Sequence, residues 1–164
     1  FGVKNDEHMY ITNYELGIEK DYRWAMEFYP ALIIDGESVV DGTYGMGIQP
    51  RSTIGQTKTG DMLLLIVDGR QTHSLGCTVE DCANIMLRYK AYQGMNLDGG
   101  SSSVMFYKGQ FITSSSSVTG RGRYMPDAFI VKKASDVSDS SYSNSSEDDG
   151  SEVINAQPAN SVNR

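Results

Sequence analysis

The longest uninterrupted apolar run in this chain is Met62–Val67, and it has only six residues. A run of that length suits a buried strand and falls far short of the roughly 18 residues that a membrane-spanning helix needs. Residues 51–57 precede it, followed by a turn with the sequence Lys-Thr-Gly-Asp at 58–61. We therefore predict a strand, a turn and a second strand over 51–67, and no membrane span.

Turns between other short apolar runs predict further strands around one helix. We expect hairpins over 31–42, turning at Asp35-Gly36, and over 103–114, turning at Lys108-Gly109. The segment 78–93 predicts the main helix, capped by Thr78 and ended by Gly94. Short strands are expected at 95–97 and 127–133. The fold class that follows is α+β, a mixed sheet of short strands and hairpins backed by one helix.

Residues 134–164 differ in composition from the rest of the chain, because they are rich in Ser, Asp and Asn and have few large apolar side chains. Such a segment cannot bury enough surface to offset the entropy of ordering it. We expect a domain over 1–133, followed by a disordered tail or a linker to an attached domain. Since the chain begins with Phe rather than Met and shows no signal peptide, we expect a trimmed piece of a longer protein.

The net charge of −7 lies mostly in the tail, which has six acidic residues and one arginine. An acidic chain without a basic face cannot neutralise many phosphates, so nucleic acid is not an expected partner. Cys77 and Cys82 are too few for a disulfide framework, and no metal-ligand spacing surrounds them, so we expect neither metal nor cofactor. We expect Cys82 to be buried and Cys77 to lie near the surface.

Polar groups able to do chemistry gather in three loops that follow or precede predicted strands. These loops contain Arg51, the segment 67–76 with sequence VDGRQTHSLG, and the segment 95–103 with sequence MNLDGGSSS. Glycines in the third loop allow positive φ and close approach of a ligand to backbone N–H groups. Arg51 and Arg70 could hold a phosphate or carboxylate. The three loops together predict a pocket for an anionic, hydroxyl-rich ligand such as a sugar phosphate.

Each of these features also has a purely structural explanation. The glycine pair and Asp68-Gly69 could be ordinary β-turns, and Glu80 could simply complement the helix N-terminus. His73 could be a surface histidine, and Arg121 and Arg123 solvated loop charges. The residues alone leave these alternatives open.

The ordered set of motifs resembles the phosphodiester glycosidase domain family, whose pattern includes R-T-A-I-G, an apolar residue before D-G-R, and N-L-D-G-G-x-S-[ST]. Two further stretches are similar: FYPALIIDGESV, with Tyr29 where the family has Gly, and RGRYMPDAFIV, with Asp127 where Asn is usual. The resemblance covers residues 28–133, and we find no match to the family's upstream NGGYF-like stretch. The matching positions are Arg51–Gly55, Asp68–Arg70, Ser74, Gly76, Thr78, Ala83 and Asn96–Ser103, with Glu80 approximate.

The resemblance implies hydrolysis between a sugar anomeric carbon and a phosphodiester, in a glycan or a cell-wall or exopolysaccharide substrate, by a secreted or cell-surface protein. Such a reaction needs a carboxylate to stabilise the oxocarbenium-like centre or to activate water. Our candidates for that role are Asp98, Asp68 and Glu80. The candidates for binding substrate are Arg51, Arg70, His73, Asn96, Gly99, Gly100, Ser101, Ser102 and Arg123.

Two other functions remain compatible with the same residues. One is a carbohydrate-binding or sugar-phosphate-binding module without catalysis. The other is a serine hydrolase that pairs Ser101 or Ser102 with His73, although the G-x-S-x-G pattern of such enzymes is absent.

Overall fold

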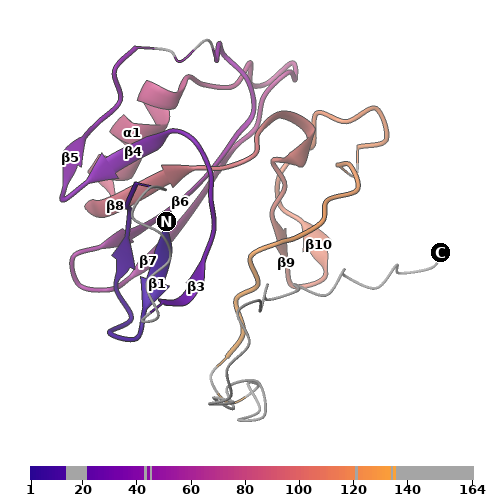
Figure 1. Ribbon diagram of the computed structural model, residues 1–164. Coiled ribbons are helices and arrows are strands. Elements are labelled where there is room, and N and C mark those ends of the chain that lie inside the picture. The colour runs from indigo at the N-terminus through magenta and orange to yellow at the C-terminus, as the bar shows by residue number, and fades with distance from the viewer. Residues whose placement is uncertain (14–21, 43, 45, 121, 134, 136–164) are drawn as a thin grey trace. The chain divides into compact units, whose positions relative to one another are not determined.

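A computed structural model describes residues 1–13, 22–42, 44, 46–120, 122–133 and 135. The chain divides into two units, Phe1–Arg123 and Tyr124–Arg164, and the strands and the α-helix described below lie in the first (Figure 1). The predicted tail lies, apart from Ser135, outside the described residues. A domain boundary near Lys133 therefore stays a prediction.

The main sheet has five strands in the spatial order β5-β4-β8-β6-β7, with every neighbouring pair antiparallel. The hairpins predicted over 31–42 and 51–67 are confirmed as its β4–β5 and β6–β7 pairs. The strands are β4 (Ala31–Ile34), β5 (Glu37–Ser38), β6 (Arg51–Thr57), β7 (Met62–Val67) and β8 (Ala91–Asn96).

The turn between β6 and β7 is stabilised by its own side chains. Thr57 and Thr59 both donate hydroxyl hydrogen bonds to the Asp61 carboxylate, over 3.1 and 2.7 Å. Gly60 adopts a φ of 97°, which a residue with a side chain rarely does. These local bonds fix the register in which Arg51 pairs with Val67 at the other end of the hairpin.

Two smaller sheets complete the first unit. One has the order β2-β1-β3 and consists of β1 (Gly2–Lys4), β2 (Met9–Tyr10) and β3 (Tyr22–Ala25). The other is the hairpin of β9 (Phe106–Tyr107) and β10 (Gln110–Phe111), which confirms the turn predicted at Lys108-Gly109.

The helix α1 spans Val79–Arg88, shorter than the predicted 78–93. Its start agrees with the sequence, since Thr78 caps it in a capping box with Asp81. Its end was predicted wrongly. Lys90 has a φ of 62°, a left-handed conformation that stops the helix, and the chain then enters β8.

Strand β8 is longer than the predicted strand at 95–97. Residues 91, 93 and 94 pair with β6, and Gly94 also pairs with Ile33 of β4 on the other side, so backbone pairing in the centre of the sheet outweighs the helical pattern of the side chains. Gly94, expected to end the helix, lies inside the strand. The strand predicted at 127–133 is also wrong, because none of the described residues 124–133 joins a ladder, and an extended segment needs a partner edge to become a strand.

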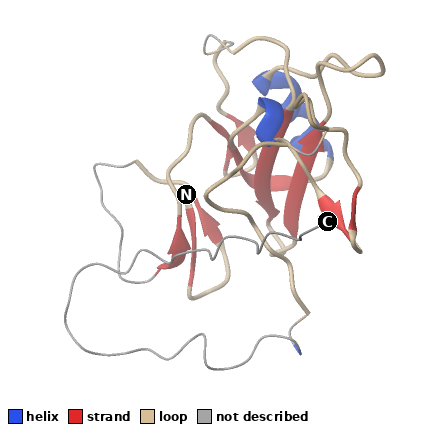
Figure 2. Ribbon diagram, turned by 90° about the vertical axis from the view of Figure 1, so that its right-hand side faces the viewer, coloured by secondary structure: helices blue, strands red, loops and turns tan. Residues whose placement is uncertain are grey.

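The main sheet is covered on both faces. Met86 of α1 packs on one face so closely that a Cβ on Gly55 would lie 2.5 Å from its Cε. On the other face, Val3 of β1 packs with Ile54 and Met95 of the sheet. Figures 1 and 2 show α1 alongside the sheet strands and the β1–β3 strands as a separate layer.

Cys77 was expected near the surface, but it is buried in the core between α1 and the sheet. The reason is a backbone bridge to Gln49, which draws residue 77 against the start of β6.

Antiparallel pairing brings the start of β6 and the end of β7 together, since Arg51 pairs with Val67. It likewise brings the start of β4 to the end of β8, where Ala31 pairs with Met95. The residues that precede β4 and β6 and the residues that follow β7 and β8 therefore lie together at one edge of the sheet. Among the described residues, no helix is long and apolar enough to cross a membrane.

Candidate functional site

A pocket of about 300 Å³ opens at this edge of the sheet, within the first unit. That volume lies at the small end of ligand sites. Most of its lining comes from the chain around the strand ends described above. The lining residues are Phe28, Tyr29, Met46, Gln49, Arg51, Arg70, Asn96, Leu97, Asp98, Gly99, Gly100, Ser101 and Arg123.

The glycine loop after β8 is folded tightly against the residue that precedes β6. Gly99 leaves no room for a side chain, because a Cβ there would lie 2.8 Å from the carbonyl oxygen of Pro50. Gly100 has a φ of 63° and donates its N–H to the same carbonyl over 2.9 Å. A short 3₁₀ turn, η2 (Gly100–Ser102), follows.

This folding limits the predicted anion-binding nest. The N–H groups of Gly100 and Ser102 are already bonded to the carbonyls of Pro50 and Gly99. The N–H groups of Gly99 and Ser101 remain as the candidates for an anion.

Arg51 lies almost wholly inside the protein, with 1% of its surface exposed. Its Nε donates to the carbonyl of Cys77 over 3.2 Å, and its Nη2 donates to the carbonyls of Met46 and Gly47 over 3.3 and 2.7 Å. The guanidinium is therefore largely held by backbone carbonyls rather than aimed at a ligand as expected. Because no described carboxylate neutralises it, its charge still acts on the pocket that it lines.

Arg70 is exposed and lies beside the glycine loop. A Cβ built on Gly100 would be 3.4 Å from Nη1 of Arg70. Its Nη2 donates to Oε1 of Gln49 over 3.1 Å, and no carboxylate of the described residues pairs with it. Arg70 is thus the cation best placed to bind an anion in the pocket.

Asp98 forms an ion pair with Arg123, and each side chain is about half exposed. Arg123 also donates from Nε to the hydroxyl of Ser102 over 2.6 Å. The pair holds one carboxylate oxygen of Asp98 at the wall of the pocket and leaves Oδ1 without a described partner.

Asn96 supplies a buried polar atom without a partner. Its Nδ2 donates to the carbonyl of Tyr29 over 2.9 Å, which fixes the direction of the amide. Its Oδ1 is buried and accepts no hydrogen bond from the residues that the structure describes, although the residue lines the pocket. Such an orphan acceptor is costly unless a ligand or water donates to it.

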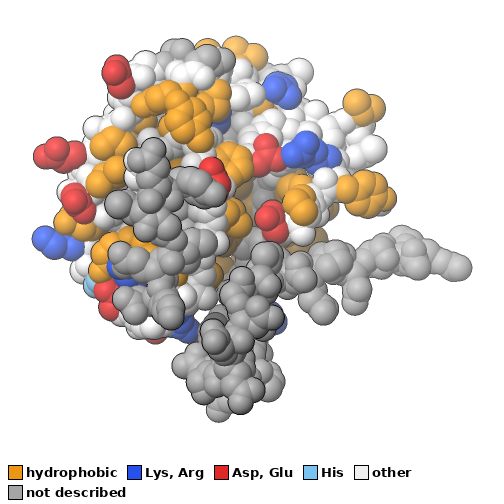
Figure 3. Space-filling model, in the orientation of Figure 1, with side chains coloured by type: hydrophobic (Ala, Val, Ile, Leu, Met, Phe, Trp, Pro, Cys, Tyr) orange, Lys and Arg blue, Asp and Glu red, His pale blue; other side chains and the backbone are white. Residues whose placement is uncertain are grey.

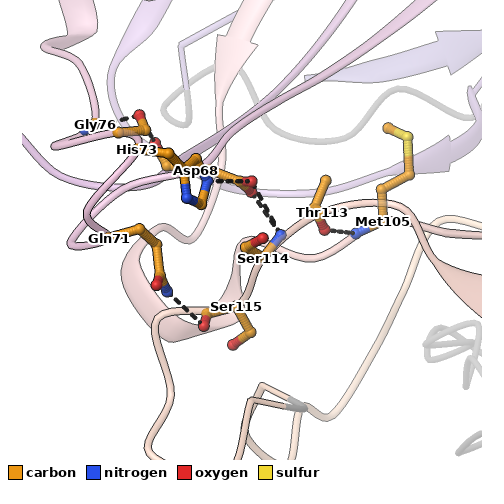
Figure 4. A network of polar contacts seen from close by, with 9 residues as sticks. Asp68, Gln71, His73, Gly76, Met105, Thr113, Ser114 and Ser115 are labelled. Atoms are coloured by element: carbon orange, nitrogen blue, oxygen red, sulfur yellow. Dashed lines mark hydrogen bonds and ion pairs between the residues drawn. The ribbon is translucent and has the colours of Figure 1, made fainter.

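Asp68 and His73 lie outside the pocket lining. Asp68 accepts the N–H of Ser114 with both carboxylate oxygens, over 2.9 and 3.0 Å, and lies 3.4 Å from Nε2 of His73. Nearby, Gln71 donates to the carbonyl of Ser115 over 2.8 Å (Figure 4). These bonds fasten the loop after β7 to residues 114–115, so this network joins two loops.

Glu80 is exposed in the first turn of α1 and does not line the pocket. Ser102 is also outside the lining, where its hydroxyl accepts from Arg123. The structure thus gathers Arg51, Arg70, Asn96, Asp98, Gly99, Gly100, Ser101 and Arg123, and leaves Asp68, His73, Glu80 and Ser102 outside.

Five lining residues were not among the candidates named from the sequence: Phe28, Tyr29, Met46, Gln49 and Leu97, the last of which lies within the predicted glycine loop. Tyr29 is 60% exposed and meets the ring of Tyr44 edge to face, with ring centroids 5.2 Å apart. Its one sequence signal was the position of the Phe-Tyr-Pro stretch directly before a predicted strand, but only the pairing shows that the start of this strand meets the end of β8.

The described residues contain no group of three or more His, Cys, Asp or Glu side chains that could hold a metal ion. Lysines and arginines lie scattered among acidic and apolar side chains on the face shown in Figure 3. The pocket is an exception to the acidic character of the chain, since its lining holds three arginines and one aspartate.

Comparisons with known proteins place these observations in a family. The chain is 32% identical over 93 residues to the SPbeta prophage-derived uncharacterized protein YomE of Bacillus subtilis, and the match covers 57% of this chain and 14% of that protein. A hypothetical protein from Synechocystis matches in structure with 26% identity and a TM-score of 0.48, over 56% of this chain and 18% of that one.

The catalytic domain of zebrafish N-acetylglucosamine-1-phosphodiester alpha-N-acetylglucosaminidase, auto-inhibited by its pro-peptide, matches with a TM-score of 0.57 and 22% identity. This likeness concerns the fold, and it covers 71% of this chain and 44% of that domain. The chain spans less than half of the length of each of these relatives.

The sequence profile of the phosphodiester glycosidase family matches residues 1–132, which is most of the chain and includes every residue of the pocket. The chain therefore belongs to the phosphodiester glycosidase family.

Proposed function

We propose that this chain hydrolyses the bond between a sugar anomeric carbon and a phosphodiester. The observation that carries the proposal is the charge of the pocket, where neither Arg51 nor Arg70 has a carboxylate partner among the described residues, in a chain of net charge −7. A small site of that charge, walled by a glycine loop, suits a phosphate diester.

Two groups of pocket residues bind the two parts of the substrate, the phosphate and the sugar. Arg70 binds the phosphate oxygens through Nη1, while the buried charge of Arg51 raises the positive potential behind it. The buried Oδ1 of Asn96, which has no partner among the described residues, accepts a sugar hydroxyl. Tyr29 presents an exposed aromatic ring on which the apolar face of a sugar can lie.

Asp98 is the proposed catalytic carboxylate. The ion pair with Arg123 holds it at the pocket wall, where it stabilises the oxocarbenium-like centre or activates water. The leaving group is a phosphate monoester, a weak base, so the reaction needs little help from a general acid. Asp68, His73 and Glu80 are assigned no chemical step, because they lie outside the pocket lining.

The substrate we propose is a glycan of the cell wall or an exopolysaccharide that carries sugar phosphodiesters, and the protein acts outside the cell. This part of the proposal is supported by the family to which the chain belongs. Fractionation of the native host, with an antibody against the chain, tests it: we expect the protein in the medium or on the cell surface, and retention in the cytosol contradicts it.

The test of the activity is turnover of a panel of sugar 1-phosphate methyl diesters. Wild type should release reducing sugar, and Asp98→Asn should lower kcat by at least about 100-fold, the contribution typical of a positioned acid or base. Glu37→Gln is the matched control, since Glu37 is exposed on the edge strand β5 at the opposite end of β4 from the pocket.

A second candidate function is a binding module that does not hydrolyse its ligand. One observation favours it: the Asp98 carboxylate is already paired with Arg123. Calorimetric binding of a diester by both wild type and Asp98→Asn, with no reducing sugar from either, would establish the module and reject hydrolysis.

A further inference from the structure

Two thiols face each other beside the pocket. Cys77 and Cys82 are free, buried cysteines whose Sγ atoms lie 3.3 Å apart. A disulfide has an S–S distance of about 2.0 Å, so the two sulfur atoms need to approach by only about 1.3 Å. The count of cysteines gave no reason to expect a disulfide, but the fold places both side chains in one core cluster.

Cys77 is hydrogen-bonded to the segment that carries Arg51, one of the three arginines that line the pocket. Its N–H and carbonyl exchange hydrogen bonds with Gln49 over 3.1 and 3.2 Å. The same carbonyl accepts Nε of Arg51 over 3.2 Å, and the side chain of Gln49 accepts from Arg70. Cys82 lies in the first turns of α1, where its N–H donates to the carbonyl of Thr78.

We propose that Cys77 and Cys82 are a thiol–disulfide pair, oxidised by a small-molecule disulfide such as glutathione disulfide, that links the start of α1 to residues 49–51, the segment that contains Arg51 and contacts Arg70. This proposal does not depend on the proposed glycosidase activity.

The reaction balances as two exchange steps. The Cys77 thiolate attacks one sulfur of glutathione disulfide and expels glutathione thiolate, leaving a mixed disulfide. Cys82 loses its proton, attacks the Cys77 sulfur and expels the second glutathione. The protein loses two electrons and two protons, and glutathione disulfide becomes two glutathione thiols.

Cys77 is the better first nucleophile of the pair. The hydrogen bond from Cys82 lowers the pKa of the Cys77 thiol, whereas the same contact and burial raise the pKa of Cys82. Cys77 also keeps 8% of its surface exposed, while Cys82 is fully buried.

Thiol trapping tests the bond. The folded chain is incubated with glutathione disulfide or with dithiothreitol, quenched in acid, unfolded, alkylated with N-ethylmaleimide and weighed intact. We expect two alkyl groups after reduction and none after oxidation, with a mass about 2 Da below that of the dithiol. Cys82→Ser should instead retain glutathione on Cys77. Two alkyl groups after oxidation, two glutathione adducts, or a disulfide-linked dimer would overturn the proposal.

Hydrogen exchange tests whether the disulfide restrains the segment of Gln49 and Arg51, and circular dichroism confirms that each sample is folded. The N–H groups of Cys77, Gln49 and Cys82 should exchange more slowly in the oxidised chain, whereas those of the β9–β10 hairpin, far along the chain, should not change. Equal exchange rates of the Gln49 N–H in the two redox forms would contradict the proposed link, because the disulfide would then form without restraining residues 49–51.

Discussion

Arg51 and Arg70 have the same side chain at the same edge of the sheet, but their surroundings give them different roles. Arg51 is enclosed, and its N–H groups bond the carbonyls of the chain around the pocket. Arg70 is exposed, keeps Nη1 beside Gly100 and has no carboxylate partner among the described residues. The first is expected to maintain the pocket and the second to bind its ligand.

Replacement of Arg70 should therefore weaken substrate binding without unfolding the protein. Arg70→Met removes a charge-assisted hydrogen bond worth about 1.5–3 kcal/mol, so KM or Kd for a sugar phosphodiester should rise roughly 10–150-fold. Arg70→Lys keeps the charge but loses the planar guanidinium, so its KM or Kd should lie between the values of wild type and Arg70→Met. Calorimetric titration measures both, and an unchanged Kd for Arg70→Met would remove Arg70 from the site.

Replacement of Arg51 should instead act on stability. Arg51→Met leaves the carbonyls of Met46 and Gly47 without their donor, and we expect a loss of about 2–4 kcal/mol in the free energy of unfolding. Arg88→Met is the control, because Arg88 is exposed in the last turn of α1 and should change stability by about 0.5 kcal/mol at most. Urea denaturation followed by circular dichroism compares them. Equal losses in the two variants would contradict the structural role of Arg51.

At the scale of elements, the start of α1 is determined by a local signal and its end is not. The Thr78–Asp81 capping box forms within four residues, so the sequence alone predicts it. The end depends on β8 entering the centre of the sheet between β4 and β6. Helical periodicity past Arg88 could not reveal that competition, because strand pairing involves partners distant in sequence.

The capping box should make helix stability depend on pH. Hydrogen bonds from the backbone and hydroxyl of Thr78 lower the pKa of the Asp81 carboxyl below its usual 3.8. A depressed pKa contributes stability that is present above the unfolded-state pKa and is lost as the pH falls through the folded-state value.

Asp81→Asn should therefore destabilise the protein by about 0.5–1 kcal/mol near neutral pH and by less in acid. The measurement is the free energy of unfolding of both proteins over a pH series, with Glu37→Gln as the control. A difference that stays constant down to the acid end of the series would show that the charge of Asp81 plays no part.

At the scale of the whole molecule, the site follows from topology. The sequence identified the loops after β7 and β8 and the residue that opens β6 as possible neighbours, and antiparallel pairing does bring these chain ends to one edge. It did not identify Tyr29 or Gln49, because their place depends on which strands are adjacent. It also could not show that Asp68 bonds to Ser114, a partner 46 residues away.

The proposed glycosidase activity is defined by which bond of a sugar phosphodiester breaks. The most direct measurement is hydrolysis in water enriched with heavy oxygen, followed by phosphorus NMR of the released phosphate monoester. Cleavage between the anomeric carbon and oxygen leaves the phosphate unlabelled and puts the heavy oxygen in the sugar, which is the result we predict. Heavy oxygen in the phosphate would show attack at phosphorus and would contradict the account.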